Sequence, residues 1–254
     1  MMFIFKKKKV VVDCFTTHAA INELFPIQKA SNFYPDWWKD LAKTFDRTTS
    51  FGLRIPSTTM KSCVGFTNLY TNGFMIPLWS DLIVETGPKN WAYEFSAPSQ
   101  IHSHDPAQFG EVVDKYHHLK IESPWVLREK TGVNFVWMSP TYNQMEHLGA
   151  YHIIPGIVDY KYNTGTNINI LFPRVQQKVL IEAGTPLAHI IPMSDNDVQI
   201  KTHCVSEQEL NKIETPSYVS SFLRKYTTNK KILEDKERKC PFGRLKQRLY
   251  KSDR

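Results

Sequence analysis

The segment 133-VNFVWMSP-140 decides the fold class, because its large apolar residues recur at every second position. Val133, Phe135 and Trp137 would all project from the same side of an extended chain. A period of two is typical of a β-strand that is covered on at least one face. We therefore predict a strand at 133–140.

Eight further segments are rich in Val, Ile, Phe, Tyr or Trp, namely 9–15, 73–84, 91–97, 152–160, 167–172, 176–182, 187–193 and 198–205. Turn formers such as Asn72-Gly73, Thr131-Gly132 and Gly184 separate many of them. Pro77 cannot donate to a strand ladder, so it indicates an edge or a bulge. Short strands at close intervals predict a mainly β chain, an antiparallel β-sandwich or jelly-roll-like barrel with a few short helices.

Three segments favour helices instead. In 34-YPDWWKDLAK-43, a first-turn proline precedes a stripe containing Trp37 and Trp38, which we expect to pack on the sheets. The segment 108–118 is a second candidate, in which Glu111, Asp114 and His118 would share one face, either a carboxylate–imidazole site or a solvated side. A third helix opens at Ser206, where Glu209 completes a capping box, restarts at Thr215-Pro216 and continues into the C-terminal tail.

Size and composition are those of a globular protein with a substantial core. A chain of 254 residues buries roughly 70–75% of its unfolded surface, and 41% of its residues are hydrophobic. Its four cysteines lie far apart, which favours reduced thiols, and Cys14 and Cys204 fall in apolar segments that suggest a core position. Apolar runs are too short for a membrane span, and 1-MMFIFKKKK-9 reverses the order of a signal peptide. We expect a location in a host cytoplasm or a virion, without secretion.

The positive charge is concentrated at the C-terminus. Residues 224–254 carry twelve Lys/Arg and four Asp/Glu, whereas the rest carry twenty and twenty-one. We therefore predict a β-rich domain over 1–205 and a helical, basic extension over 206–254. The cations proposed to bind an acidic partner or nucleic acid are Lys230, Lys231, Lys239, Arg244, Lys246, Arg248 and Lys251. A solvated helix that only aids solubility is the alternative.

The stretch 101-IHSHDPAQFGE-111 raises the question of a metal site. His102, His104 and Glu111 are candidate ligands of iron, manganese or zinc, and they resemble the first metal motif of cupins. Six residues separate His104 from Glu111, more than cupins allow, and Pro106 interrupts the strand that would carry them. A loop whose histidines bond to backbone or solvent is the favoured interpretation, with no cofactor.

Several aromatic and polar side chains are candidates for binding a ligand. Trp79 and Asp81 lie two positions apart, so a strand would place them on one face, where they suit a sugar or an amide. The structural alternative is a core tryptophan and a turn-capping aspartate. The full candidate set is Trp79, Asp81, His104, Gln108, Lys120 and Trp125.

The landmarks 34-YPDWW-38, 74-FMIPLWSD-81, 104-HDPAQ-108, 120-KIESPWVL-127, 131-TGVNFVWMSP-140, 155-PGIVD-159 and 184-GTPLAHIIP-192 occur in that order. Together they resemble an uncharacterised family of tailed-bacteriophage and bacterial proteins. The resemblance covers residues 10–195 and implies a β-sandwich or jelly-roll fold, with no assigned chemistry.

No nucleophile elbow, phosphate-binding glycine loop or zinc-protease motif occurs in the sequence. We therefore predict no catalytic residues. The expected function is that of a non-catalytic protein of phage origin, a virion component or binding module, with viral structural proteins among its expected partners. The alternative is a cupin-like, metal-dependent small-molecule enzyme.

Overall fold

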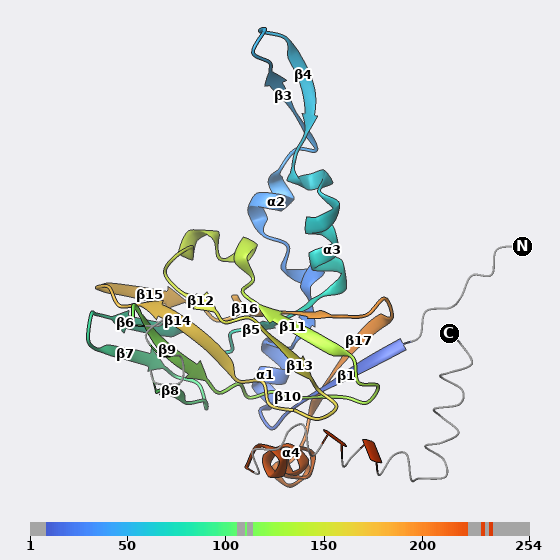
Figure 1. Ribbon diagram of the computed structural model, residues 1–254, viewed down its shortest axis with the longest axis vertical. Coiled ribbons are helices and arrows are strands. Elements are labelled where there is room, and N and C mark those ends of the chain that lie inside the picture. Colours follow the sequence, from blue (N-terminus) through green and yellow to red (C-terminus); the bar gives the residue numbers. More distant parts are fainter. Residues whose placement is uncertain (1–8, 106–109, 111–113, 223–229, 232–233, 236–254) are drawn as a thin grey trace, which may run out of the picture.

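The computed structural model describes residues 9–105, 110, 114–222, 230–231 and 234–235. The prediction of a mainly β chain is confirmed, since the strands form several mostly antiparallel sheets accompanied by a few short helices (Figure 1). A two-stranded hairpin extends far from the body of the protein, which holds the remaining sheets.

The central sheet is built around the segment 133–140, which contains β11 (Asn134–Met138). Its strands, in spatial order, are β13 (Gly156–Asp159), β11, β16 (Pro186–Pro192), β5 (Phe74–Pro77) and β2 (Gln28–Lys29). Phe135 and Trp137 are buried, as their alternation predicts. Opposite Pro77 the register of β16 shifts between Pro186 and Ala188, so the bulge predicted from this proline is present.

A second sheet contains the one parallel pair among the described strands. It has the order β10 (Val126–Glu129), β1 (Lys9–Thr16) and β17 (Asp197–Cys204). Residues 9–16 of β1 pair in parallel with residues 197–204 of β17, whereas β10 is antiparallel to β1. The pairing joins the two ends of the segment 1–205, whose existence as one cooperative domain stays a prediction.

Two further sheets complete the body. One has the order β12 (His152–Ile153), β14 (Ile168–Pro173), β9 (Tyr116–Ile121) and β8 (Ile101–Ser103), and the other β15 (Gln177–Ile181), β6 (Leu82–Thr86) and β7 (Trp91–Phe95). The helix predicted over 108–118 is wrong at its C-terminal end, because Tyr116 begins a strand. Pairing of β9 with both β14 and β8 stabilises this strand. The predicted strand 73–84 is two strands, β5 and β6, separated by a turn.

One apolar core joins these sheets, with Trp125, Phe135, Tyr160 and Phe172 among its largest fully buried side chains. Cys14 is buried within it, as expected, and burial raises the pKa of its thiol. Cys204 is exposed, so its predicted core position is wrong. It ends β17, beyond the part of this strand that packs on the core.

A smaller aromatic cluster lies beside the central sheet. Its elements are η1 (Ala30–Phe33), α2 (Asp36–Asp40), η2 (Met60–Ser62) and α3 (Val64–Asn72). The short helix α1 (Ala19–Leu24) packs instead on β1 and β17 and places Ile21 in the main core. Trp38 stacks on Phe66 of α3 at 5.4 Å between ring centroids, and Trp37 makes an edge contact with the same ring at 5.8 Å. The two tryptophans were predicted to pack on the sheets. They pack instead on a helix that the sequence analysis did not identify.

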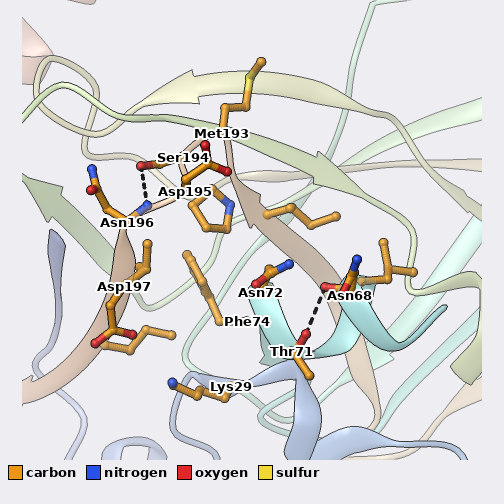
Figure 2. Close-up of a pocket in the computed structure, with 16 residues that line it drawn as sticks. Lys29, Asn68, Thr71, Asn72, Phe74, Met193, Ser194, Asp195, Asn196 and Asp197 are labelled. Carbon is orange, nitrogen blue, oxygen red and sulfur yellow. Dashed lines mark hydrogen bonds between the residues drawn. The ribbon is translucent and has the colours of Figure 1, made fainter. Parts of the chain in front are cut away.

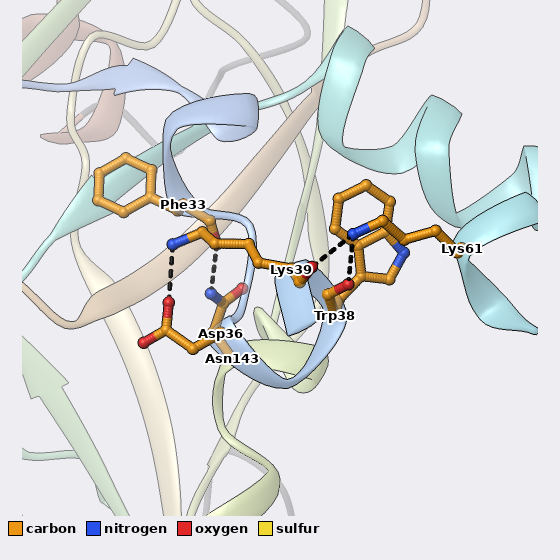
Figure 3. A network of polar contacts seen from close by, with 6 residues as sticks. All are labelled: Phe33, Asp36, Trp38, Lys39, Lys61 and Asn143. Atoms are coloured by element: carbon orange, nitrogen blue, oxygen red, sulfur yellow. Dashed lines mark hydrogen bonds and ion pairs between the residues drawn. The ribbon is translucent and has the colours of Figure 1, made fainter. Parts of the chain in front are cut away.

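Polar contacts fix the end of α2 (Figure 3). The Lys61 ammonium donates to the backbone oxygens of Trp38 at 2.8 Å and Lys39 at 2.7 Å, and it lies 4.2 Å from the Trp38 ring centroid. A cation at the C-terminal carbonyls of a helix is favourable. Asn143 of η5 (Thr141–Asn143) donates to the oxygen of Phe33 at 2.6 Å. The segments on either side of the projecting hairpin are therefore tied to each other and to the body.

The projecting hairpin consists of β3 (Thr44–Thr48) and β4 (Arg54–Thr58). Its strands pair with each other in antiparallel register, from Thr44 opposite Thr58 to Thr48 opposite Arg54. Gly52 in the connecting turn has a φ of 78°, a conformation that glycine adopts without strain. We call residues 44–58 the arm.

The last described helix is α4 (Glu207–Phe222). Its predicted capping box is present: the Ser206 hydroxyl donates to Glu209 at 2.9 Å, and the Glu209 carboxylate also accepts the Ser206 N–H at 3.1 Å. The expected restart at Thr215-Pro216 does not occur, because the helix is continuous from 207 to 222. In the part of the chain that the structure describes, every helix is too short or too polar to cross a membrane.

Candidate functional site

The two tryptophans predicted to bind a ligand lie in the protein interior. Trp79 is 4% exposed and its indole donates to the Ser99 hydroxyl at 3.1 Å. Trp125 is 1% exposed. Asp81 accepts the N–H of Ala183 at 2.8 Å and so closes a turn. These positions match the structural alternative given for Trp79 and Asp81.

Of the two predicted histidines, His102 lies in β8 beside Lys120 of β9, and His104 follows directly after the end of β8. His102 of β8 is opposite Lys120 of β9, and both approach the Glu122 carboxylate, at 3.4 and 3.5 Å. The His104 ring stacks on His118 with 4.3 Å between centroids. Burial, followed by the charge of His104, lowers the pKa of His118.

Glu111 and Gln108 lie outside the described residues. Within the described ranges, no group of three or more His, Cys, Asp or Glu side chains has an arrangement that would hold a metal ion. Of the cations predicted to bind an acidic partner, only Lys230 and Lys231 are described, while Lys239, Arg244, Lys246, Arg248 and Lys251 fall outside.

Lys230 reaches back to a carboxylate on the body. Its ammonium lies 3.5 Å from Oδ2 of Asp159, the last residue of β13, and the Asp159 side chain is 5% exposed. The other oxygen, Oδ1, accepts the backbone N–H of Lys161 at 3.0 Å. The turn is also closed by the N–H groups of Tyr162 and Asn163, which donate to the Asp159 backbone oxygen at 3.1 and 3.0 Å.

Two ammonium groups approach the same aromatic ring in this turn. The Lys161 and Lys230 nitrogens lie 5.3 and 5.2 Å from the Tyr162 ring centroid, within the range of a cation–π contact. The stem of Lys161 passes 3.7 Å from the place where a Cβ on Gly132 would stand. The turn therefore places a nearly buried carboxylate, an aromatic ring and two cations together, and we call Asp159, Lys161, Tyr162 and Lys230 the Asp159 cluster.

A neighbouring buried carboxylate, Glu129, has a different environment. Glu129 accepts hydrogen bonds from the backbone N–H groups of Thr131, Gly132 and Val133 and from the Thr131 hydroxyl. Both of its oxygens are occupied by donors of its own turn, so its role is structural. By contrast, Oδ2 of Asp159 lies against the ammonium of a long side chain, which a ligand can displace.

A cavity of about 660 Å³ lies elsewhere, between α3 and the β16–β17 loop (Figure 2). Lys29, Asn68, Asn72, Asp195 and Asp197 surround it above an apolar floor that includes Phe74. Such a mixture suits a small polar molecule. Its carboxylates are exposed to water, however, so the cavity offers binding groups without a desolvated acid or base.

Behind this cavity, His189 joins β16 to α3. Its Nε2–H donates to the backbone oxygen of Leu69 at 3.1 Å, and burial lowers its pKa to about 4. Gly73 is required beside it, because a Cβ there would stand 2.3 Å from His189 Nε2. The histidine is neutral at pH 7 and holds two elements together.

Sequence reasoning did not identify the Asp159 cluster. The segment 155-PGIVD-159 stood out as a landmark, but a single aspartate at the end of a strand gives no sign of its burial. Lys230 is separated from it by 71 residues, so that their proximity is a property of the folded chain.

No protein-family model and no curated protein matches the chain. Among solved structures, the chain is similar to a mutant dUTPase from phage phi11 of S. aureus, with 13% identity, a TM-score of 0.31, and 65% of this chain and 99% of that one covered. It is also similar to a mutant dUTPase of Staphylococcus bacteriophage 80alpha, with 13% identity, a TM-score of 0.29, and 66% of this chain and 94% of that one covered. The native EIAV dUTPase is similar with 15% identity and a TM-score of 0.25, and the match covers 50% of this chain and 81% of that one.

These findings overturn the function predicted from the sequence. The similar structures are those of enzymes, two of them from phages, so the prediction of a non-catalytic virion component or binding module is wrong. The metal site of the cupin-like alternative is not tested, because Glu111 lies outside the described residues. At such identities and TM-scores the similarity carries no mechanism, and the function of this chain has to follow from its own residues.

Proposed function

We propose that the chain is a phosphoanhydride hydrolase that acts on a nucleoside triphosphate at the Asp159 cluster. The observation that carries this proposal is the Asp159 carboxylate, nearly buried and joined at Oδ2 to a displaceable ammonium, in one turn with an aromatic ring and a second ammonium. Each of these groups matches one part of a nucleotide.

The two lysines supply the charge that a triphosphate requires. Ammonium groups bind phosphate oxygens as point charges, and they are favoured where a polyanion replaces a weak internal ion pair. The Lys230–Asp159 pair is long, at 3.5 Å, so exchanging the carboxylate for phosphate costs Lys230 little. Tyr162 then offers its ring to the base or the sugar, since stacking on an aromatic face accepts any base.

Asp159 acts as the general base. Its Oδ1 stays on the Lys161 N–H and fixes the orientation of the carboxylate, while Oδ2 accepts the proton of a water molecule. When the water oxygen attacks the α-phosphorus, the α–β anhydride P–O bond breaks and pyrophosphate leaves with the bridging oxygen. When it attacks the γ-phosphorus, the β–γ bond breaks, the nucleoside diphosphate keeps the bridging oxygen, and the released phosphate carries the water oxygen. The substrate phosphates would hold a magnesium ion, which would neutralise part of their charge while Lys161 and Lys230 bind the remainder.

The test is hydrolysis by the full chain, with phosphate and pyrophosphate release measured for dATP, dCTP, dGTP, dTTP and dUTP in the presence of magnesium. Asp159→Asn is expected to lower kcat about 100- to 10,000-fold, the usual contribution of a general base, with a KM change of less than about fivefold. Tyr162→Ala is expected to raise KM more than it lowers kcat.

The control is Asp36→Asn, which alters another aspartate that pairs with a lysine, Lys39 at 2.8 Å, on the exposed surface of α2. This variant is expected to retain the wild-type rate. Wild-type protein that hydrolyses none of the five nucleotides, or an Asp159→Asn variant with an unchanged kcat, would refute the proposal.

A further inference from the structure

The arm presents one apolar face that no described part of its own chain covers. Antiparallel pairing places Phe45 opposite Ser57 and Arg47 opposite Ile55, on the face that Leu53 also shares. The exposed fractions are 51% for Phe45 and 65% for Leu53, and Phe51 at the tip reaches 89%. Clustered exposure of large apolar side chains marks an interaction surface.

An isolated two-stranded ribbon is only marginally stable in water, so the arm requires a covering surface. Its base is held rigidly, because Lys61 and Asn143 fasten the adjoining segments, whereas its length extends away from the body (Figures 1 and 3). Pro56 removes a backbone donor from the outer side of β4, which discourages pairing with further strands at that edge. The apolar face, rather than a strand edge, is the surface available for docking.

Charge identifies the kind of partner. Residues 43–61 contain four Lys/Arg and one Asp, a net charge of +3, whereas residues 9–42, 62–105, 110 and 114–222 contain thirteen Lys/Arg and nineteen Asp/Glu, a net charge of −6. Lys43, Arg47 and Arg54 form no ion pair with another described residue. A basic arm on an acidic body is complementary to a second copy of the same chain.

A receiving cavity of about 490 Å³ lies on the body, between the segment of η5 and η6 (Met145–His147) and β15. Asn143 lines this cavity and also bonds to Phe33 and Tyr70 at the arm's base. The cavity carries the acidic side chains of Glu146 and Glu182 and the half-exposed apolar side chain of Leu180. The one lysine in its lining, Lys178, is already paired with Glu85 at 2.6 Å. It therefore combines a volume sufficient for an aromatic side chain with the charge that the arginines require.

We propose that two copies of the chain clasp each other through their arms. The arm of each copy lies along the other copy, with Phe51 in the cavity beside Leu180 and with Arg47 and Arg54 near Glu146 and Glu182. Each copy carries both the arm and the cavity, so two arms that run in opposite directions allow both contacts to form at once. The result is a closed, two-fold symmetric dimer.

The contact has the size of a stable interface. The fifteen arm residues and ten cavity-lining residues of each copy together supply at most 25 residues a side. Stable interfaces involve about 20–30 residues a side. Formation of this dimer also explains how the protein tolerates such an exposed arm, because the partner copy covers the apolar face of each arm.

The first experiment measures the mass of the full chain by light scattering during size-exclusion chromatography. A chain of 29.5 kDa is expected to elute with twice that mass. Substituting both Phe51→Ser and Leu53→Ser is expected to raise the dimer dissociation constant about 100-fold or more, because these anchors are buried only in the dimer. Leu24→Ser, at a body position with 66% exposure close to the 65% of Leu53, is the matched control and should leave the dimer intact.

Two further measurements identify the contact itself. Arg47→Glu with Arg54→Glu should weaken the dimer, and adding Glu146→Lys and Glu182→Lys to the same chain should restore it. In a mixture of Phe51→Cys and Leu180→Cys chains, oxidation should yield a disulfide-linked pair that neither chain forms alone.

Three outcomes overturn the proposal. The first is a monomer at all concentrations up to about 100 μM, well above the range of specific dimers. The second is a dimer that the Phe51→Ser and Leu53→Ser variant retains unchanged. The third is arm-dependent binding of duplex DNA by a monomeric protein, which would make nucleic acid the occupant.

Discussion

Lowering the pH from 7 to 4 is expected to remove about 3 kcal/mol from the free energy of unfolding through one side chain, His189. Burial lowers the pKa of this histidine to about 4, from 6.5 in the unfolded chain. Between these values the unfolded chain binds the proton more readily than the folded protein. The stabilising contribution is therefore complete above pH 6.5 and is lost as the pH falls through that window.

The structural cause is a neutral ring held between two elements. Protonation would put a charge on an imidazole that is 1% exposed and whose Nε2–H already serves Leu69. The nearby backbone leaves no space for rearrangement, since Gly73 lies against the same nitrogen. The histidine therefore stays neutral in the folded protein until the pH approaches its lowered pKa of about 4.

Urea denaturation at pH 7, 5.5 and 4 measures this effect. His189→Gln retains an N–H donor for Leu69 and does not titrate, so its unfolding free energy should fall less with acid than that of the wild type, by about 3 kcal/mol at pH 4. His147→Gln, on the exposed η6 helix (Met145–His147), is the control. Parallel pH curves for wild type and His189→Gln would contradict the assignment.

Replacing Glu129 is expected to cost at least about 3 kcal/mol, because its carboxylate holds four donors of the β10–β11 turn and each hydrogen bond to a charged group contributes about 1.5–3 kcal/mol. Glu129→Ala leaves three backbone N–H groups without their acceptor. Glu129→Gln keeps the shape but directs an NH₂ group at one set of donors, so we expect a smaller loss than for alanine.

Equilibrium unfolding in urea at pH 7 measures both variants, with circular dichroism as the signal. Glu85→Gln is the matched control, since this glutamate pairs with Lys178 at 2.6 Å on the surface and exposed pairs contribute about 0–1 kcal/mol. A loss below about 1 kcal/mol for Glu129→Ala would show that water replaces the carboxylate in the turn.

Local pattern predicted the elements whose stability is local. The alternation around Phe135 and Trp137 located β11, and Ser206 with Glu209 located the start of α4. The bulge at Pro77 followed from the missing donor of proline. In each case the decisive interaction lies within a few residues, or depends only on which face of the strand is buried.

The alternation of apolar residues failed to predict strands that contain several polar residues. In 116-YHHLKI-121, the inward positions include His117, which bonds to the Gly87 oxygen at 2.8 Å, and so the period of two was hidden. The segment was consequently predicted as the end of a helix. The arm was missed for a related reason, since its strands are exposed on both faces and lack the alternation of a half-buried strand.

By itself, the sequence determined that this chain is mainly β, which residues of β11 face the core and how α4 begins, because side-chain period and capping act over a few residues. Only the tertiary structure decided which distant segments meet. It paired β1 with β17 in parallel and brought Lys230 to Asp159. Closing such long loops costs conformational entropy, and the packing of the whole body offsets that cost. The sequence marked Lys230 only as one cation of the basic tail, because its approach to Asp159 depends on these long-range contacts.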